Sequence, residues 1–221
     1  MDVLQTVRTT LILAFRSFPL LMISFIGFLA IGLGNLGLFI LFMGQAVLVP
    51  IATALAQYLS EKIPETIPPS YHIKSSQASQ LVPLHPYTAP MQNVTPSYWM
   101  MQVSFLFFYI LANAVSIYML PVDSKLPAAY TDNRKSTAVT IMLTTFFWLG
   151  IVIWLRAMTH TEKLWGILVA IGMGAGLGFG WYQFAAVCGA RSADVFGIVQ
   201  QILPATALET TPMTCVYAPK P

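Results

Sequence analysis

The stretch that decides the fold runs from residue 17 to residue 60 and reads SFPLLMISFIGFLAIGLGNLGLFILFMGQAVLVPIATALAQYLS. It contains no charged residue. As a single helix it would be roughly 65 Å long, about twice the thickness of a bilayer's hydrocarbon core. The sequence GLGNLG at residues 32–37 favours a tight turn, because Gly and Asn tolerate a positive φ. We therefore predict a transmembrane helical hairpin with arms at about 18–33 and 36–58, kinked at Pro50.

The composition of the whole chain indicates that lipid covers much of its surface. Of the 221 residues, 57% are hydrophobic and only 9% are charged, whereas a soluble domain carries about 25% charged residues. The net charge of +3 is too small and too scattered for a surface that binds nucleic acid. The chain is therefore expected to be an integral, multi-pass membrane protein that does not bind nucleic acid.

The remaining segments divide around this hairpin. Residues 1–17 carry apolar side chains at helical spacing, which predicts an amphipathic helix at the membrane interface. Residues 61–97 hold seven of the fifteen prolines and predict an extended loop outside the membrane. Residues 98–188 predict a three-helix transmembrane bundle, and residues 189–221 an interfacial helix followed by an irregular tail. The three spans of that bundle are predicted at about 98–120, 137–155 and 164–187.

The predicted fold class is thus an all-α, polytopic transmembrane helix bundle with amphipathic interfacial helices at both ends. Its length favours five spans, with residues 18–60 crossing twice. In the alternative of four spans, residues 17–60 form one tilted span followed by a helix on the membrane surface.

The positive-inside rule separates these two arrangements only weakly. Four spans divide the basic residues seven against four, with both termini in the cytoplasm. Five spans divide them six against five, so the rule does not indicate which side is cytoplasmic. We predict five spans, because the length of the uncharged stretch is the harder constraint. In that arrangement the two sides hold Arg8, Arg16, Lys62, Lys74, Arg156 and Lys163 against Lys125, Arg134, Lys135, Arg191 and Lys220.

Five glycines alternate with other residues in the last predicted span. On a helix they form two stripes on roughly opposite faces. Missing side chains let neighbouring backbones approach closely, as in the small-xxx-small motifs that drive helix association in lipid. We therefore predict that this helix packs between two neighbours, in the same chain or in adjacent copies. The stripes are Gly172, Gly176 and Gly180 on one face and Gly174 and Gly178 on the other.

The polar residues within the predicted spans are uncharged. Ion-coupled transporters and proton pumps place Asp, Glu, Lys, Arg or His in the bilayer, and these spans contain none of them. Gln102 and Asn113 lie about three helical turns apart and share a face. We favour interhelical hydrogen bonds for both side chains, with a polar path across the membrane as the alternative.

Signals of catalysis are sparse. His72, His85 and His160 lie outside the predicted spans and have no second ligand at a metal-binding spacing. Cys188 and Cys215 form neither a zinc motif nor a disulfide framework. The DNRK sequence at residues 132–135 is typical of a solvated turn before a helix. We expect no enzyme, and no catalytic, cofactor-binding or metal-binding residues.

A glycosylation sequon begins at Asn93, in the proline-rich loop. It is available for modification only if this loop lies on the extracytoplasmic side, as the four-span arrangement places it. Pro96 and the nearby membrane boundary at Tyr98 count against its use.

The C-terminal quarter carries a resemblance to a known group of proteins. The glycine ladder is followed by ADVFGIV at residues 193–199, QQILP at 200–204 and PMTCV at 212–216. This region resembles small multi-pass membrane proteins of large icosahedral double-stranded DNA viruses. The resemblance implies a protein of the virion's internal membrane, under or within a capsid shell, and it carries over no catalytic residue.

These features predict a non-enzymatic structural membrane protein that anchors or organises a larger assembly. The resemblance would make this assembly the internal membrane and capsid of a large DNA virus. Partner proteins would bind residues 61–97 and 204–221, and the glycine helix would support a homo-oligomer. Two alternatives stay open. One is an oligomeric channel or transport subunit with Gln102 and Asn113 facing the pore; the other is an accessory subunit of a membrane protein complex.

Overall fold

The structure, a computed structural model, describes residues 3–62, 96–120, 128–158 and 164–188. Most of the predicted proline-rich loop, the sequon at Asn93, and the predicted interfacial helix and tail of residues 189–221 lie outside these ranges.

All the regular structure in the described residues is helical, which confirms the predicted all-α class. Four segments are long and apolar enough to cross a membrane: Leu36–Ala56, Tyr98–Met119, Thr131–Ala157 and Gly166–Cys188. The remaining predicted span, the first in the chain at about 18–33, corresponds to a shorter apolar helix, Ser17–Leu33. The elements are α1 (Val3–Leu33), α2 (Leu36–Met43), the π-helix η1 (Gly44–Leu48), α3 (Val49–Lys62), α4 (Tyr98–Met119), α5 (Ala128–Met158) and α6 (Leu164–Cys188).

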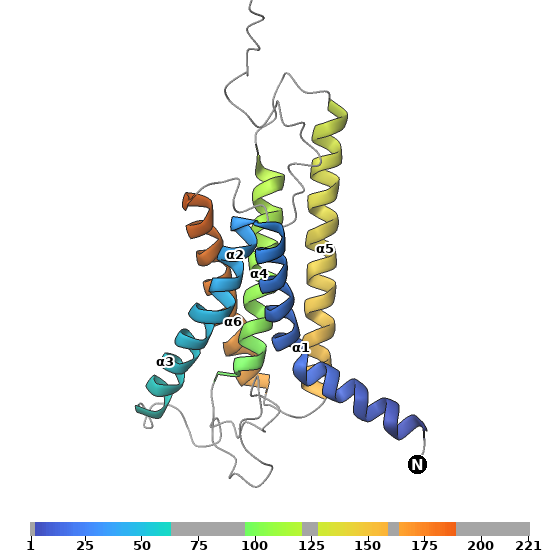
Figure 1. The fold of residues 1–221 in the computed structure, drawn as a ribbon, viewed down its shortest axis with the longest axis vertical. Helices are drawn as coiled ribbons and strands as arrows, with labels where there is room; N and C mark the ends of the chain where they lie inside the picture. Colours follow the sequence, from blue (N-terminus) through green and yellow to red (C-terminus); the bar gives the residue numbers. More distant parts are fainter. Residues whose placement is uncertain (1–2, 63–95, 121–127, 159–163, 189–221) are drawn as a thin grey trace, which may run out of the picture.

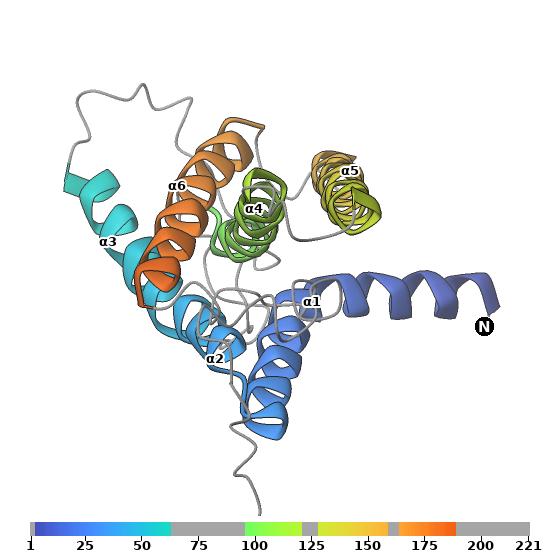
Figure 2. The same ribbon diagram turned by 90° about the horizontal axis from the view of Figure 1, so that it is seen from above.

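Helix α1 contains both the predicted N-terminal helix and the first arm of the hairpin. Its N-terminal half runs outward, away from the other helices, and its second half packs beside α2 (Figures 1 and 2). Pro19 lies inside the helix. A proline there removes a backbone donor and favours a bend, which accounts for the change of direction.

The hairpin turns at Gly34 and Asn35, inside the stretch where the sequence predicts the turn. Gly34 has a φ of +60°, a left-handed conformation that glycine adopts without a steric penalty. The Asn35 side chain caps α2 by accepting hydrogen bonds from the backbone N–H groups of Gly37 at 2.8 Å and Leu38 at 3.3 Å. The turn thus reverses the direction of the chain between α1 and α2 while satisfying two donors at the start of α2.

Replacing Asn35 by alanine should lower the free energy of unfolding by about 1 kcal/mol, because the two capped N–H groups lose their side-chain acceptor. The measurement is unfolding of the purified protein in lipid bicelles. Asn35→Ser is the control, since its hydroxyl can still cap the helix. An equal loss of stability in both variants would argue that the side chain acts through something other than the cap.

Pro50 explains why the second arm contains a π-helix. Proline has no N–H, and its ring crowds the carbonyl four residues earlier in a regular α-helix. The chain responds by widening over residues 44–48, so that the Val49 N–H donates to the carbonyl of Gly44. The Gln45 carbonyl is left without its usual backbone donor, since Val49 is engaged and Pro50 has none. The kink predicted at Pro50 is thus a π-bulge just before it.

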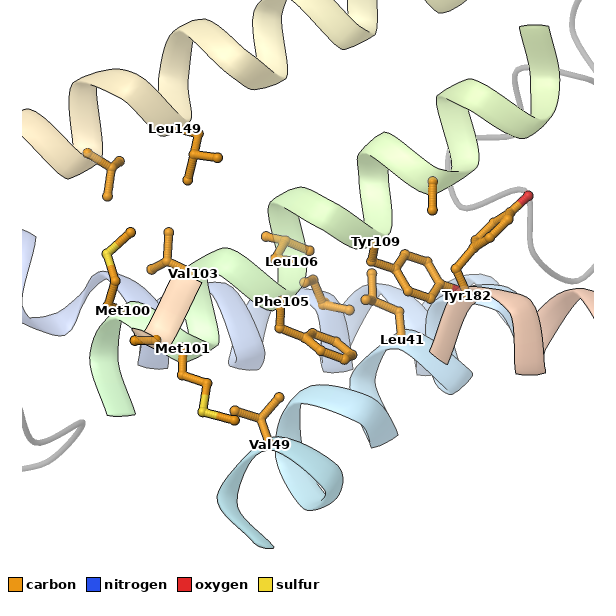
Figure 3. Close-up of a cluster of buried hydrophobic side chains, with 14 of the residues drawn as sticks. Leu41, Val49, Met100, Met101, Val103, Phe105, Leu106, Tyr109, Leu149 and Tyr182 are labelled. Atoms are coloured by element: carbon orange, nitrogen blue, oxygen red, sulfur yellow. The ribbon is translucent and has the colours of Figure 1, made fainter. Parts of the chain in front are cut away.

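Helix α4 is the central helix of the bundle. In its most apolar stretch, 72% of the residues are buried, whereas the corresponding share is 22% for α5, 28% for α6 and 33% for the second arm of the hairpin. Helices α5 and α6 pack on α4, and successive membrane-length helices alternate in direction (Figure 1). The core around α4 includes Leu41, Val49, Met101, Phe105, Tyr109, Leu149 and Tyr182 (Figure 3).

The start of α5 differs from the prediction. Residues 132–135 are not a solvated turn but part of α5, which begins at Ala128. Arg134 is buried and donates from its guanidinium to the carbonyl of Leu120 at the end of α4, at 2.6 Å. A tertiary hydrogen bond to an otherwise unpaired helix-end carbonyl therefore outweighs the turn preference of Asp132 and Asn133.

Candidate functional site

The outer surface of the bundle is apolar. Large hydrophobic side chains stand exposed along the helices that are long enough to cross a membrane and along the second half of α1. An extended apolar surface on helices of membrane length indicates contact with lipid. The chain is a multi-pass membrane protein. Exposed side chains include Phe25, Phe28, Ile31, Val47, Ile51, Leu143, Phe146, Phe147, Leu168 and Phe184.

One glycine stripe of this membrane protein packs directly on α4. A Cβ atom added to Gly174 would lie 2.7 Å from the Ser104 Cβ and 3.0 Å from the Met101 carbonyl oxygen. One added to Gly178 would lie 2.6 Å from the Phe105 carbonyl oxygen. These obstacles include backbone atoms, so α6 and α4 approach this closely only because both positions lack a side chain.

The other glycine stripe is open. Gly172, Gly176 and Gly180 are exposed, and within the described part of the chain a Cβ added to any of them would meet nothing within 4 Å. Gln183 is exposed as well, and it lies two turns after Gly176 on the same side of the helix. The chain therefore supplies one of the two neighbours that the sequence predicts for this helix, and the second face carries a smooth stripe beside a polar amide.

The hairpin is attached to α6 by a contact that the sequence analysis did not identify. The Trp181 indole Nε1–H donates to the carbonyl of Ile40 in α2 at 2.8 Å. Gly44 makes room for the ring, since a Cβ there would lie 2.6 Å from both the Trp181 Nε1 and the Phe105 Cζ. A tryptophan near a span end is typical of the aromatic belt at a membrane interface, so its position in the sequence does not indicate a hydrogen bond to another helix.

Gln102 forms the interhelical hydrogen bond that the sequence analysis favoured. Its Nε2 donates to the backbone carbonyl of Gln45 at 2.9 Å and to the Tyr98 hydroxyl at 3.1 Å. The Gln45 carbonyl is the one that the π-helix and Pro50 leave without a backbone donor. A side chain on α4 thus satisfies a backbone acceptor in the middle of the second hairpin arm.

Gln102 and Asn113 are both buried inside the single chain, at 0% and 2% exposure. They therefore face the interior of the bundle and not its lipid-exposed surface. Several polar atoms in the same interior have no hydrogen-bond partner: Gln45 Oε1 and Nε2, Gln102 Oε1, Ser104 Oγ and Tyr109 Oη.

A second buried arginine lies at the other end of α5. Arg156 is 1% exposed, and its guanidinium carbon is 4.7 Å from the centre of the Trp99 ring, a cation–π contact. Arg134 and Arg156 thus attach opposite ends of α5 to opposite ends of α4. In the part of the chain that the structure describes, no three His, Cys, Asp or Glu side chains gather where they could hold a metal ion.

Comparison with known proteins adds no relative. No protein-family model matches the chain, and neither a curated protein nor a solved structure is detectably similar to it.

Proposed function

We propose that this protein is a non-enzymatic structural subunit that organises a larger membrane-bound assembly by packing against other transmembrane helices. The observation that carries the proposal is the open stripe of Gly172, Gly176 and Gly180 on α6. Its counterpart at Gly174 and Gly178 already brings two helices into backbone contact. The same geometry on the opposite face is therefore available to a helix from outside the chain.

Lipid favours the use of such a face. Apolar side chains gain little by leaving lipid for a helix interface, so association depends on close packing and on interhelical hydrogen bonds. The open glycine stripe permits the close packing. The exposed amide of Gln183, near the C-terminal end of α6, offers a hydrogen-bonding group to a helix that packs on this face.

Two finer parts of the proposal rest on the sequence alone. Residues 61–97 and 204–221 would bind partner proteins outside the bilayer. The resemblance of the C-terminal quarter to viral membrane proteins would place the assembly at the internal membrane of an icosahedral virus, beneath its capsid.

The decisive experiment compares native membrane particles containing the wild-type chain with particles containing Gly176→Leu. The first carbon of this side chain meets nothing within 4 Å in the residues that the structure describes, but leucine prevents close approach of an outside helix. We expect the variant to dissociate from the particle about tenfold more readily, equivalent to about 1.4 kcal/mol, with unchanged thermal stability of the single chain. Size and partner proteins would be measured by native mass spectrometry after mild solubilisation.

Phe147→Leu is the matched control, since Phe147 is 65% exposed on a different helix, α5. It should leave the particle intact. Identical particles for wild type and Gly176→Leu, or a wild-type chain that is solitary in its native membrane, would contradict the proposed role of the open stripe.

A further inference from the structure

Gln45 is a polar residue in the most apolar part of the hairpin. It belongs to a buried stripe with Leu41, Val49 and Thr53 that faces α4. Its side chain is 0% exposed, and neither Oε1 nor Nε2 has a hydrogen-bond partner among the described residues. A fully buried amide with two unpaired atoms is strongly unfavourable in a dry core, and native proteins rarely retain one.

Gln102 lies against the same point of the hairpin. Its Nε2 bonds to the Gln45 carbonyl at 2.9 Å, while its Oε1 is buried and unpaired. Rotating the Gln102 amide does not remove the problem. After the rotation, Gln102 Oε1 would face the Gln45 carbonyl oxygen in place of Nε2. The contact at 2.9 Å would then join two acceptors and become repulsive.

We propose that a water molecule binds inside the bundle between η1 and α4, held by the side chains of Gln45 and Gln102. The three unpaired atoms are two acceptors, Gln45 Oε1 and Gln102 Oε1, and one donor, Gln45 Nε2. Water can donate two hydrogen bonds and accept one, and buried waters typically make about three. A cation would satisfy the two oxygens but not the amide N–H group, so the donor set selects a neutral molecule that also accepts.

Two local features favour a water molecule at this position. The π-helix at residues 44–48 widens the backbone beside Gln45, and such bulges often accompany functional sites. Tyr98 begins α4 and is only partly buried, and its hydroxyl accepts from Gln102. A polar series therefore runs from the start of α4 to the middle of the second hairpin arm, through Tyr98, Gln102 and Gln45.

Water-edited solid-state NMR on the full-length protein in liposomes, with ¹⁵N-labelled glutamine and tryptophan, tests the proposal. Magnetisation starting on water should reach the side-chain amides of Gln45 and Gln102 early. It should reach the Trp181 indole late, because that group is bonded to the Ile40 carbonyl. The Gln45→Leu and Gln102→Leu variants assign the two signals.

Early transfer to both glutamines establishes the site, whereas transfer as slow as that to Trp181 overturns it. The melting temperature of Gln45→Leu gives an independent readout. If the core were dry, removing two unpaired polar atoms would raise the melting temperature, and that result would also overturn the proposal. With bound water, the variant loses a satisfied network, so its melting temperature should stay level or fall. Failure of Gln45→Leu to fold leaves the wild-type transfer rates to decide.

Discussion

Replacing Gly178 by leucine should lower the free energy of unfolding by about 3 kcal/mol or more, close to the upper range for overpacked cores. The first added carbon would already lie 2.6 Å from the Phe105 carbonyl oxygen and 3.1 Å from the Tyr109 backbone nitrogen. Backbone atoms of a central helix cannot rotate aside as a flexible side chain can. Helix α6 would have to move away from α4, which opens the core around Tyr109 and Tyr182.

The two glycine stripes make this prediction specific. Gly176→Leu introduces the same side chain into the same helix, two residues away, but on the face where a Cβ meets no described residue within 4 Å. It should leave the unfolding free energy of the isolated chain within about 0.5 kcal/mol of wild type. Steric trapping in bicelles measures both values. Equal destabilisation by the two variants would show that the loss at Gly178 does not come from its contact with α4.

Replacing Gln102 by leucine should cost about 1–2 kcal/mol of stability. The Gln45 carbonyl has lost its backbone donor to the π-helix and Pro50, so the Gln102 amide at 2.9 Å is the donor that satisfies it. Leucine has a similar size, which limits any cavity, and the loss therefore reports mainly the unpaired carbonyl.

Gln183→Leu is the matched control for this change. Gln183 is a glutamine in a membrane-length helix but is exposed on the open face of α6. Its replacement should not lower the stability of the single chain, as followed by the same bicelle unfolding measurement. A Gln102→Leu variant as stable as wild type would mean that the Gln45 carbonyl finds another donor, and the role assigned to Gln102 would be wrong.

The sequence by itself determined the local elements of this protein. The uncharged stretch of residues 17–60 exceeds one membrane thickness, and its Gly-Asn pair allows a turn, so the two helices and the turn at Gly34 and Asn35 followed from length and backbone preference. The glycine stripes followed from helical periodicity alone, because residues four apart share a face whatever surrounds the helix.

Only the tertiary structure decided which of those faces the chain itself occupies. Both glycine stripes are equivalent in the sequence, yet Gly174 and Gly178 contact α4 while Gly172, Gly176 and Gly180 stay open. Helix pairing in lipid depends on complementary shapes brought together from distant segments, and no spacing within one helix reveals its partner.

The acceptors of the buried polar side chains could not be predicted for the same reason. Gln102 bonds to residue 45, Trp181 to residue 40, and Arg134 to the carbonyl of Leu120 across the end of α4. Each acceptor is a backbone carbonyl, which every residue possesses and which therefore leaves no mark in the sequence. The folded backbone made two of these carbonyls available, because that of Leu120 lies at a helix end and that of Gln45 lies in the π-helix before Pro50. The Ile40 carbonyl accepts from Trp181 in addition to the backbone N–H of Gly44.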